Sequence, residues 1–438
     1  MNIAMIGTGY VGLVSGVCFA EFGFNVACVD SNAAIVERLG KGEVTIFEPG
    51  LDTLLERNLA EGRLSFTTDL AAAVGAADVV FIAVGTPSRR GDGAADLQYI
   101  YAAADQVAAA MRPGTVIAIK STVVVGTGAR VRDHIAKARP GVAFSMVSNP
   151  EFLREGSAIE DFMRPDRVIA GVDDAAGREA MQRIYRPLSL RDSPLMLTSL
   201  ENAEIIKYAA NAFLAMKVTF INQVADLCEQ VGGNVHDVAR GIGMDKRIGA
   251  KFLHAGPGFG GSCFPKDTRA FAATGREHDA PQRLIETVVE VNEARKASLA
   301  ARIVAEARRV GGSVVAVLGI AFKPGTDDIR EAPSLDIVAA LRKAGLAVRA
   351  HDPEAMDNAR AVLEDVVWCN SAYEAVEGAH VTVLMTEWNA YRALDLKLLA
   401  RRMAGNVLID LRNVYQAADL EGSGLVYQSI GRPRLIAG

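Results

Sequence analysis

Residues 3–12 of the chain read IAMIGTGYVG, an apolar run followed by glycines in the spacing Gly7-x-Gly9-x-x-Gly12. The run is typical of a strand, and Val11–Phe22 after it is typical of a helix. In a strand–turn–helix unit each glycine has a mechanical task. Gly7 allows the tight turn, Gly9 lets the backbone approach a pyrophosphate, and Gly12 lets the helix pack on the strand. The stretch therefore predicts an α/β fold with a dinucleotide site at its first turn.

A carboxylate stands where such a site needs one. A second apolar run, Val26–Val29, ends at Asp30, about 20 residues after the glycines. A carboxylate there accepts hydrogen bonds from both ribose hydroxyls and repels a 2′-phosphate, which favours NAD over NADP. Tyr10 and Val11 open the helix, whose unpaired N–H groups meet the phosphate charge. The alternative is a glycine turn that binds nothing, and the order of strand, turn, helix and acid argues against it.

The composition describes a globular chain without a polyanionic partner. Its 438 residues suggest two or three domains at roughly 150 residues each. Lys and Arg number 47 against 52 Asp and Glu, so no basic excess points to nucleic acid. The longest uncharged run, residues 1–20, is interrupted by the glycine turn, and no basic leader follows Met1, so we expect neither a membrane span nor export. Five scattered cysteines without a CxxC pair, and histidines without metal spacing, predict a cytoplasmic protein that holds no metal.

Two regions follow from the pattern of apolar runs. Further runs lack the alternation of a half-exposed sheet and predict parallel strands covered by helices: Val79–Val84, Val116–Ile119, Ala143–Val147 and Val168–Ala170. We assign residues 1–200 to this Rossmann-like, NAD-binding domain. Glu201–Val231 contains no Gly or Pro, which predicts a helix of about 30 residues, about 45 Å long. It opens a central helical domain, residues 201–310, with a further helix from Pro281 to about Val310, and its long helix offers a face for a homodimer.

A second α/β unit follows at residues 311–438. It alternates strands and a helix without a second glycine pattern: strand Ser313–Gly319, helix Ser334–Ala344, and strands Ala347–Ala350, Val381–Met385 and Val407–Asp410. The predicted fold is therefore α/β, with two Rossmann-like doubly wound domains joined by a long central helix and a helical middle region.

Polar side chains follow several of the predicted strands. Thr86 and Thr122 follow two neighbouring runs, and Glu151 and Glu155 follow a third. Because ligands of open parallel sheets bind beyond the carboxyl ends of the strands, we expect these side chains near the cofactor. Either threonine alone could equally serve a turn or a helix cap.

The stretch GFGGSCFPKD, residues 258–267, gives Cys263 a particular setting. Its glycines let the backbone fold tightly around a bound group, and Pro265 can open a helix whose N-terminus faces the thiol. That dipole and Lys266 would lower the pKa of the Cys263 thiol, and Asp267 is close enough for proton transfer. The other cysteines are interpreted as small buried hydrophobic residues: Cys18, Cys28, Cys228 and Cys369.

Lys207 and Asn211 share one face of the long helix, because they are spaced i, i+4. A Lys is costly to bury in a helix rich in Ala and Ile unless it has a purpose. For Lys207 alone, a solvated surface side chain would be the simpler interpretation.

Seven stretches together carry a family resemblance. The chain resembles the UDP-glucose/GDP-mannose dehydrogenase family over nearly its whole length, and within it the UDP-glucose 6-dehydrogenases. EPGL at 48–51 and EVNEARK at 290–296 also fit that branch. The seven stretches are GTGYVGLVSG (7–16), VGTP (84–87), KSTVVVGT (120–127), NPEFLREG (149–156), ENAEIIKYAANAF (201–213), GFGGSCFPKD (258–267) and FKPGTDDIREAPS (322–334).

The resemblance implies that the C6 alcohol of UDP-glucose is oxidised to the carboxylate of UDP-glucuronate by two hydride transfers to NAD. Cys263 would hold the intermediate aldehyde as a thiohemiacetal and then a thioester, which a hydroxyl would do less well because it is a poorer leaving group. Lys207 and Asn211 would stabilise oxyanion character. Asp267 and Thr122 would move protons through a shared water, and Glu151 would help to hydrolyse the thioester.

The resemblance also assigns binding residues. Besides the glycine turn, Asp30, Thr86 and Thr122, those for the cofactor are Glu155, Lys266 and Arg330. Those for the substrate are Glu151, Phe152, Leu153, Arg154, Glu155, Lys207, Asn211, Phe252, Leu253, His254, Ala255, Gly256, Gly260 and Lys323, with Arg247 reaching across a subunit interface.

One departure and three alternatives remain. The family often has a Lys five residues after the ribose-binding Asp, where this chain has Ile35, so we expect weaker NAD binding or a substitute donor such as Asn32. A sibling enzyme acting on GDP-mannose or a UDP-N-acetyl sugar is the first alternative. A one-step hydroxyacid dehydrogenase is the second, and it would need no cysteine. A cofactor-binding regulator without catalysis is the third, and it would show a broken catalytic set.

Overall fold

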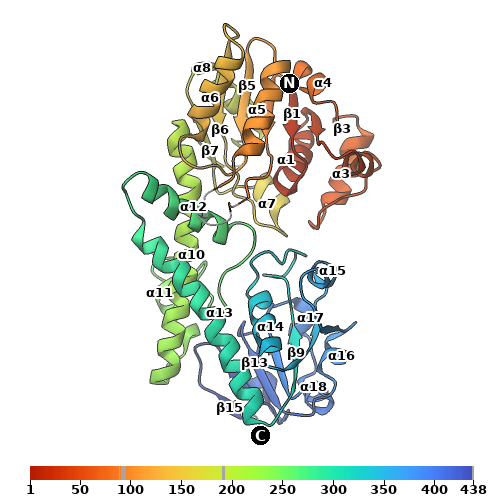
Figure 1. Ribbon diagram of the computed structural model, residues 1–438, viewed down its shortest axis with the longest axis vertical. Coiled ribbons are helices and arrows are strands. Elements are labelled where there is room, and N and C mark those ends of the chain that lie inside the picture. Colours follow the sequence, from red (N-terminus) through yellow and green to blue (C-terminus); the bar gives the residue numbers. More distant parts are fainter. Residues whose placement is uncertain (88, 90–94, 190–192, 437–438) are drawn as a thin grey trace. The chain divides into compact units, whose positions relative to one another are not determined.

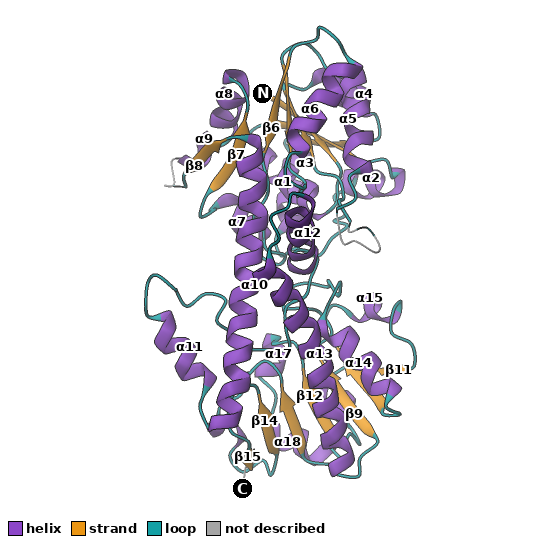
Figure 2. Ribbon diagram, turned by 60° about the vertical axis from the view of Figure 1, so that its left-hand side comes forward, coloured by secondary structure: helices purple, strands orange, loops and turns teal. Residues whose placement is uncertain are grey.

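The computed structural model describes residues 1–87, 89, 95–189 and 193–436, which form two compact units (Figure 1). The first unit comprises residues 1–210 with 273–281, and the second comprises 211–272 with 282–438. Each contains one sheet flanked by helices, shown in orange and purple in Figure 2. In the described part of the chain, no helix is both long and apolar enough to cross a membrane.

The sheet of the first unit has the strand order β3-β2-β1-β4-β5-β6-β7-β8. The order reverses between β1 and β4, which places the crevice for a ligand beyond the carboxyl ends of those two strands. The strands are β1 (Asn2–Ile6), β2 (Asn25–Val29), β3 (Leu64–Thr67), β4 (Val79–Ile82), β5 (Thr115–Ile119), β6 (Phe144–Ser148), β7 (Val168–Val172) and β8 (Leu195–Thr198).

Helices cover both faces of this sheet, as the continuous apolar runs predict. One apolar cluster joins the sheet to α1, α3, α7 and α8, and the other joins it to α4, α5 and α6. The helices are α1 (Tyr10–Glu21), α2 (Ala33–Gly40), α3 (Leu51–Ala60), α4 (Leu70–Ala76), α5 (Gln98–Ala110), α6 (Thr127–Ala138), α7 (Ala158–Met163), α8 (Ala175–Ile184) and α9 (Arg186–Ser189).

One strand direction was predicted wrongly. The run Val168–Ala170 was expected to be parallel to its neighbours, but β7 pairs antiparallel with β6, with Val147 opposite Val172. An apolar run reports burial on both faces of a sheet and carries no information about chain direction, so the sequence pattern could not reveal this.

Long helices dominate the part of the chain that follows. α10 (Leu200–Val231) has 32 residues and contributes to both units, since Ala210 lies in the first and Asn211 in the second. α13 (Arg283–Arg309) packs beside α10 in the second unit, where Arg295 bonds Asp226 and Arg302 bonds Glu229. The shorter helices here are α11 (Val235–Gly243) and α12 (Phe264–Glu277).

The sheet of the second unit has the order β11-β10-β9-β12-β13-β14-β15 and is parallel except for its last pair. Its apolar cluster includes residues of α10, α13 and α14. The strands are β9 (Val314–Leu318), β10 (Ala347–His351), β11 (Val366–Trp368), β12 (Val381–Leu384), β13 (Val407–Asp410), β14 (Val426–Ser429) and β15 (Leu435–Ile436). The helices are α14 (Pro333–Lys343), α15 (Met356–Arg360), α16 (Ala372–Val376), α17 (Asn389–Arg392), α18 (Leu396–Arg402) and α19 (Ala417–Leu420).

Candidate active site

The glycine turn after β1 has the geometry of a phosphate cradle. Gly7 has φ +98°, and a Cβ added there would lie 2.8 Å from the carbonyl oxygen of Ala83. A Cβ on Gly12 would lie 2.0 Å from the oxygen of Gly7, so neither position accepts a side chain. Nothing lies within 4 Å of the space that a Cβ on Gly9 would fill. Gly9 is the N-cap of α1 and gives it no side-chain cap, so an anion can meet the helix N-terminus there.

Asp30 follows β2 directly and is an ionised hydrogen-bond acceptor. Its Oδ2 accepts from the N–H of Thr8 at 3.0 Å and from the Thr8 hydroxyl at 2.7 Å, and its Oδ1 accepts from the N–H of Asn32 at 2.9 Å. Burial raises the pKa of Asp30, but these hydrogen bonds outweigh burial and the net pKa is lowered. A fixed carboxylate beside the glycine turn fits the ribose of NAD. Ile35 packs against the core of the unit, and the Asn32 side chain caps α2.

The loops after β4 and β5 are tied together. The Thr86 hydroxyl donates to the carbonyl of Thr122 at 2.9 Å, and the Ser121 hydroxyl donates to the carbonyl of Val84 at 2.7 Å. Thr86 is buried, so its hydroxyl acts as a brace for the neighbouring loop, while Thr122 is partly exposed. Both predicted threonines therefore lie at the carboxyl edge of the sheet.

Glu151 and Lys207 form a buried ion pair in the first unit. The Lys207 Nζ lies 3.0 Å from the Glu151 Oε1, and the side chains are 3% and 6% exposed. Burial raises the pKa of Glu151, but Lys207, the N–H of Leu153 and Lys120 together outweigh it, so the net pKa is lowered. The solvated alternative for Lys207 is thereby excluded. The Phe152 ring lies 5.2 Å from the Lys207 Nζ and 3.9 Å from the Arg167 guanidinium.

A second buried cation is Lys120, the first residue of the stretch KSTVVVGT, to which sequence reasoning gave no role. Its Nζ donates to the Asn149 Oδ1 at 3.4 Å and lies 5.7 Å from the Phe162 ring. Burial lowers the pKa of Lys120 to about 8, with Lys207 adding to the effect and Glu151 opposing it. Arg154, in contrast, turns to Asp161 at 2.6 Å and is 61% exposed.

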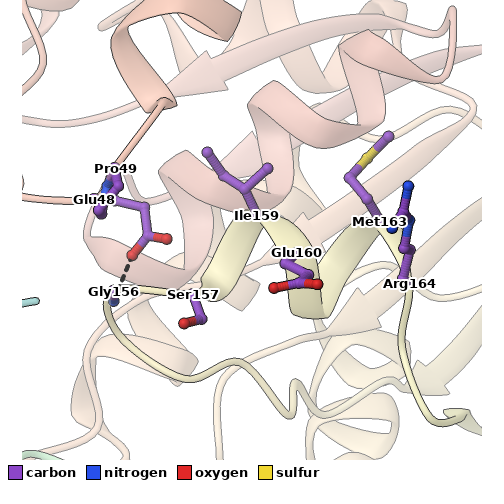
Figure 3. Close-up of a pocket in the computed structure, with 8 residues that line it drawn as sticks. All are labelled: Glu48, Pro49, Gly156, Ser157, Ile159, Glu160, Met163 and Arg164. Carbon is purple, nitrogen blue, oxygen red and sulfur yellow. Dashed lines mark hydrogen bonds between the residues drawn. The ribbon is translucent and has the colours of Figure 1, made fainter.

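Glu48 connects the glycine turn to the loop after β6, and sequence reasoning missed it. Its carboxylate accepts the Tyr10 hydroxyl, the N–H of Gly156 at 2.7 Å and the N–H of Ala158 at 2.7 Å. Figure 3 shows Glu48 reaching Gly156 at one end of a hollow of about 510 Å³. The available signal was the turn EPGL with its one acid, but the N–H groups that Glu48 binds, those of Gly156 and Ala158, lie more than a hundred residues later in the chain.

Cys263 stands at the start of α12 in the second unit. Its carbonyl accepts the N–H of Asp267 at 2.8 Å, which makes it the residue that precedes the first turn, as the position of Pro265 predicts. It is partly exposed, whereas the other four cysteines are buried and unpaired. The glycines before it are sterically required: a Cβ on Gly260 would lie 2.4 Å from the oxygen of Glu331, and one on Gly261 would lie 2.7 Å from the Phe322 ring.

Asp267 is the centre of a polar group beside Cys263. Its Oδ2 accepts from the Asn211 amide at 2.6 Å, and its Oδ1 lies 3.0 Å from the Lys266 Nζ. Asp267 is 1% exposed, so the carboxylate depends on these two partners. Asn211, Asp267 and Lys266 are therefore brought together in this unit, while Glu151 and Lys207 are brought together in the other.

The remaining predicted residues of the second unit are a set from the Cys263 loop and Lys323, which differ in burial, and two arginines that form ion pairs. Leu253, Ala255 and Gly256 are buried, Phe252, Gly260 and Lys323 are partly exposed, and His254 is exposed. Arg247 and Arg330 pair with their neighbours Asp245 and Asp328 at 2.6 and 2.8 Å. Arg412 was missed: it follows β13, donates to the carbonyls of Phe322 and Met385, and closely approaches Gly256.

Comparison with known proteins covers all three regions of the chain. Residues 1–189 match the NAD binding domain of the UDP-glucose/GDP-mannose dehydrogenase family, 201–294 its central domain and 316–417 its UDP binding domain. The glycine turn and Asp30 thus lie in the part that binds NAD, which is the cofactor.

Individual relatives agree over the full length. The UDP-glucose 6-dehydrogenase of Rhizobium meliloti (strain 1021) is 56% identical, over 99% of this chain and 100% of its own. That of Pseudomonas aeruginosa is 45% identical over 99% of this chain and 98% of its own. A UDP-glucose dehydrogenase structure from Pyrobaculum islandicum is 39% identical, with TM-score 0.89, covering 100% of this chain and 97% of that one. The chain belongs to the UDP-glucose/GDP-mannose dehydrogenase family.

Proposed function

We propose that this protein oxidises the C6 alcohol of UDP-glucose to the carboxylate of UDP-glucuronate, with Cys263 as the covalent nucleophile. The observation that carries the proposal is the setting of the thiol. It is the one partly exposed cysteine of the five, it stands at the N-terminus of α12, and the Asn211–Asp267–Lys266 group adjoins it in sequence and structure. The names of the most similar relatives support UDP-glucose as the substrate.

The reaction requires a carbon that changes oxidation state twice. Two NAD molecules, bound in turn, would supply the oxidant by accepting one hydride each. After the first oxidation, the Cys263 thiolate adds to the aldehyde carbon, so that a C–S bond forms and the carbonyl oxygen becomes an alkoxide that takes up a proton. In the second oxidation the thiohemiacetal carbon loses a hydride to the oxidant and its hydroxyl loses a proton to a base, which leaves a thioester. Water then adds to it, the C–S bond breaks, the thiolate leaves and a carboxylate remains.

Five further residues are assigned to charge and proton handling. Asp267, held by Asn211 and Lys266, is assigned as the acceptor for the alcohol proton. The amide N–H of Asn211 and the ammonium group of Lys207 are assigned to stabilising the developing oxyanion. Glu151, an ionised carboxylate in a buried setting, is assigned to the water that hydrolyses the thioester. Thr122 remains assigned to proton transfer.

We further propose a cytoplasmic homodimer. Phe213, Phe220 and Leu227 are spaced by seven residues on α10 and are 57%, 52% and 61% exposed. Three large apolar side chains in line on one long helix form a stripe of the kind that a second helix covers. None of the five cysteines is in a disulfide, which fits a reducing compartment.

The stoichiometry of NADH tests the proposed function. With UDP-glucose and excess NAD, two NADH should form for each sugar consumed, and one would exclude the mechanism. Cys263→Ala should abolish net turnover while both ligands still bind. GDP-mannose and UDP-N-acetyl sugars, assayed in parallel, test the alternative substrates. They are included because a UDP-D-ManNAc dehydrogenase structure is 27% identical to this chain.

A further inference from the structure

The loop that precedes Cys263 is held by buried side chains of the two long helices. On α13, the Asn292 side chain grips the peptide groups of Phe259: its Oδ1 accepts the Phe259 N–H at 2.9 Å, and its Nδ2 donates to the Phe259 carbonyl at 3.1 Å. Gly258 is adjacent, with φ +118°, and a Cβ there would lie 2.7 Å from the Asn292 Oδ1. The amide therefore fits against a backbone without a side chain.

A second pair of hydrogen bonds holds the backbone three residues earlier, at Gly256. Its N–H donates to the Asn222 Oδ1 of α10 at 2.8 Å, and its carbonyl accepts from the Arg295 Nε of α13 at 2.7 Å. Arg295 is itself fixed by the Asp226 carboxylate at 2.8 and 2.9 Å. Both main-chain groups of Gly256 and both of Phe259 are thus bonded to side chains of helices.

These helix side chains are costly to bury. Asn222, Asn292 and Arg295 are 1%, 3% and 7% exposed. The Arg295 Nη2 is buried and has no hydrogen-bond acceptor among the residues that the structure describes. A buried donor without a partner destabilises the folded chain, and an apolar residue of similar length would avoid that destabilisation. Arg295 is therefore a poor choice for packing alone and a good one for fixing the Gly256 carbonyl.

We propose that Asn292, Arg295 and Asn222 are positioning residues for Cys263. By locking Gly256 and Phe259 onto α10 and α13, they fix the chain four residues before the thiol, and the start of α12 fixes it immediately after. A nucleophile must be held to within about 0.5 Å of its productive position. None of the three needs to touch substrate or cofactor. The inference rests on the proposed role of Cys263.

The matched control is Asn413, which grips one peptide in the same way at a different place in the second unit. Its Oδ1 accepts the N–H of Ile430 at 2.9 Å and its Nδ2 donates to the carbonyl of Ile430 at 2.9 Å. It is 8% exposed. Asn292→Asp and Asn413→Asp each keep the acceptor and replace the donor by a carboxylate oxygen, so the two changes are chemically identical.

The experiment measures the alkylation rate of Cys263 by iodoacetamide, kcat, and NAD affinity in the full-length protein. We expect both variants to lose similar thermal stability. Only Asn292→Asp should change the alkylation rate and lower kcat, on the order of 10- to 100-fold, with NAD affinity unchanged. The other cysteines are buried, so alkylation of the native protein reports Cys263.

Equal alkylation rates and equal kcat for the two variants would overturn the inference, because Asn292 would then have only a structural role. If Asn292→Asp does not fold, Arg295→Lys, which retains one donor, takes its place in the same comparison. Failure of the proposed function would be seen separately, in the wild-type protein. It would then give one NADH per sugar and no thioester on Cys263, whatever alkylation rates Asn292→Asp and Arg295→Lys show.

Discussion

The Lys207 ammonium lies 3.0 Å from the Glu151 carboxylate, and the two side chains are almost completely buried. They are 56 residues apart in sequence, one at the start of α10 and the other after β6. A buried charge is tolerated because its partner is present. Removing either residue should therefore lower the stability of the fold, because the other charge would stay buried without its partner.

Lys207→Met should therefore leave Glu151 as a buried charge without its ion-pair partner. We expect the free energy of unfolding to fall by about 3–5 kcal/mol, measured with urea at pH 7. Adding Glu151→Gln should restore most of that stability but none of the activity. If the double variant is as unstable as Lys207→Met, the loss of unfolding free energy does not come from the broken ion pair.

Lys120 should make stability depend on pH. Its pKa falls from 10.5 to about 8 on folding, chiefly through burial, with Glu151, Lys207 and Cys18 as the other groups that act on it. Between these values the unfolded chain holds a proton that the folded chain has released, so this lysine makes stability rise with pH across the window. Below pH 8 both states are protonated and the full penalty is present, about 3 kcal/mol.

The variant that removes this titration is Lys120→Met. Its stability advantage over the wild type should shrink by about 3 kcal/mol between pH 8 and pH 10.5, as followed by urea unfolding at several pH values. A difference that stays constant over that range would show that Lys120 does not titrate in the folded chain.

The glycine turn offers a paired test. Gly12→Ala should lower the melting temperature strongly, because its Cβ would overlap the oxygen of Gly7. Gly9→Ala meets empty space, so it should keep the melting temperature and weaken NAD binding by about 10-fold or more, since the methyl group stands where the pyrophosphate approaches. Calorimetric titration with NAD decides this, and unchanged affinity in Gly9→Ala would place the phosphate elsewhere.

Glu48→Gln should raise the KM for NAD about 5- to 10-fold, with less effect on kcat, because one carboxylate joins Tyr10 of the glycine turn to Gly156. Burial and Glu48 itself raise the pKa of Tyr10, so the phenol remains a donor at every pH of interest. Glu160→Gln, in the same hollow but exposed, is the control and should match the wild type. Equal KM values for the two variants would remove the role of Glu48.

The apolar stripe predicts the oligomeric state. Phe220→Glu should convert a dimer to monomers in sedimentation velocity, because it buries a charge in the helix contact. Val362→Glu introduces the same charge at another exposed apolar position, 58% exposed, and should leave the assembly intact. A dimer that survives Phe220→Glu would assign the contact to another surface.

Much of the fold could be predicted because local patterns report burial and helix length directly. The absence of Gly and Pro between Glu201 and Val231 predicted a helix that the structure confirms as Leu200–Val231. The pattern could not give the direction of β7. It also did not reveal the edge strand β8 (Leu195–Thr198), whose side chains are partly exposed on both faces although its first three residues are apolar. Direction and edge strands depend on pairing, which a single segment does not carry.

The site was predictable where one residue type has one task, as at Gly7, Gly12 and Cys263. It was not predictable where the task depends on a distant partner. Glu48 bonds Gly156, 108 residues later, and Asn292 bonds Phe259, 33 residues earlier. Thr86 was expected near the cofactor, and its hydroxyl bonds the backbone of Thr122. Such contacts arise from the tertiary fold, so spacing within a segment cannot reveal them.

Between Phe213 and Leu227, α10 presents its apolar stripe outward, while Asn222 bonds Gly256 and Ile221 and Ala225 are buried. A helix turns by about 100° per residue. One inserted or deleted residue in this segment would rotate everything beyond it, exchanging solvent-facing and core-facing positions together. The segment can therefore vary in composition from one lineage to another, but its length has to stay constant, and gaps in aligned relatives should fall in the loops around it.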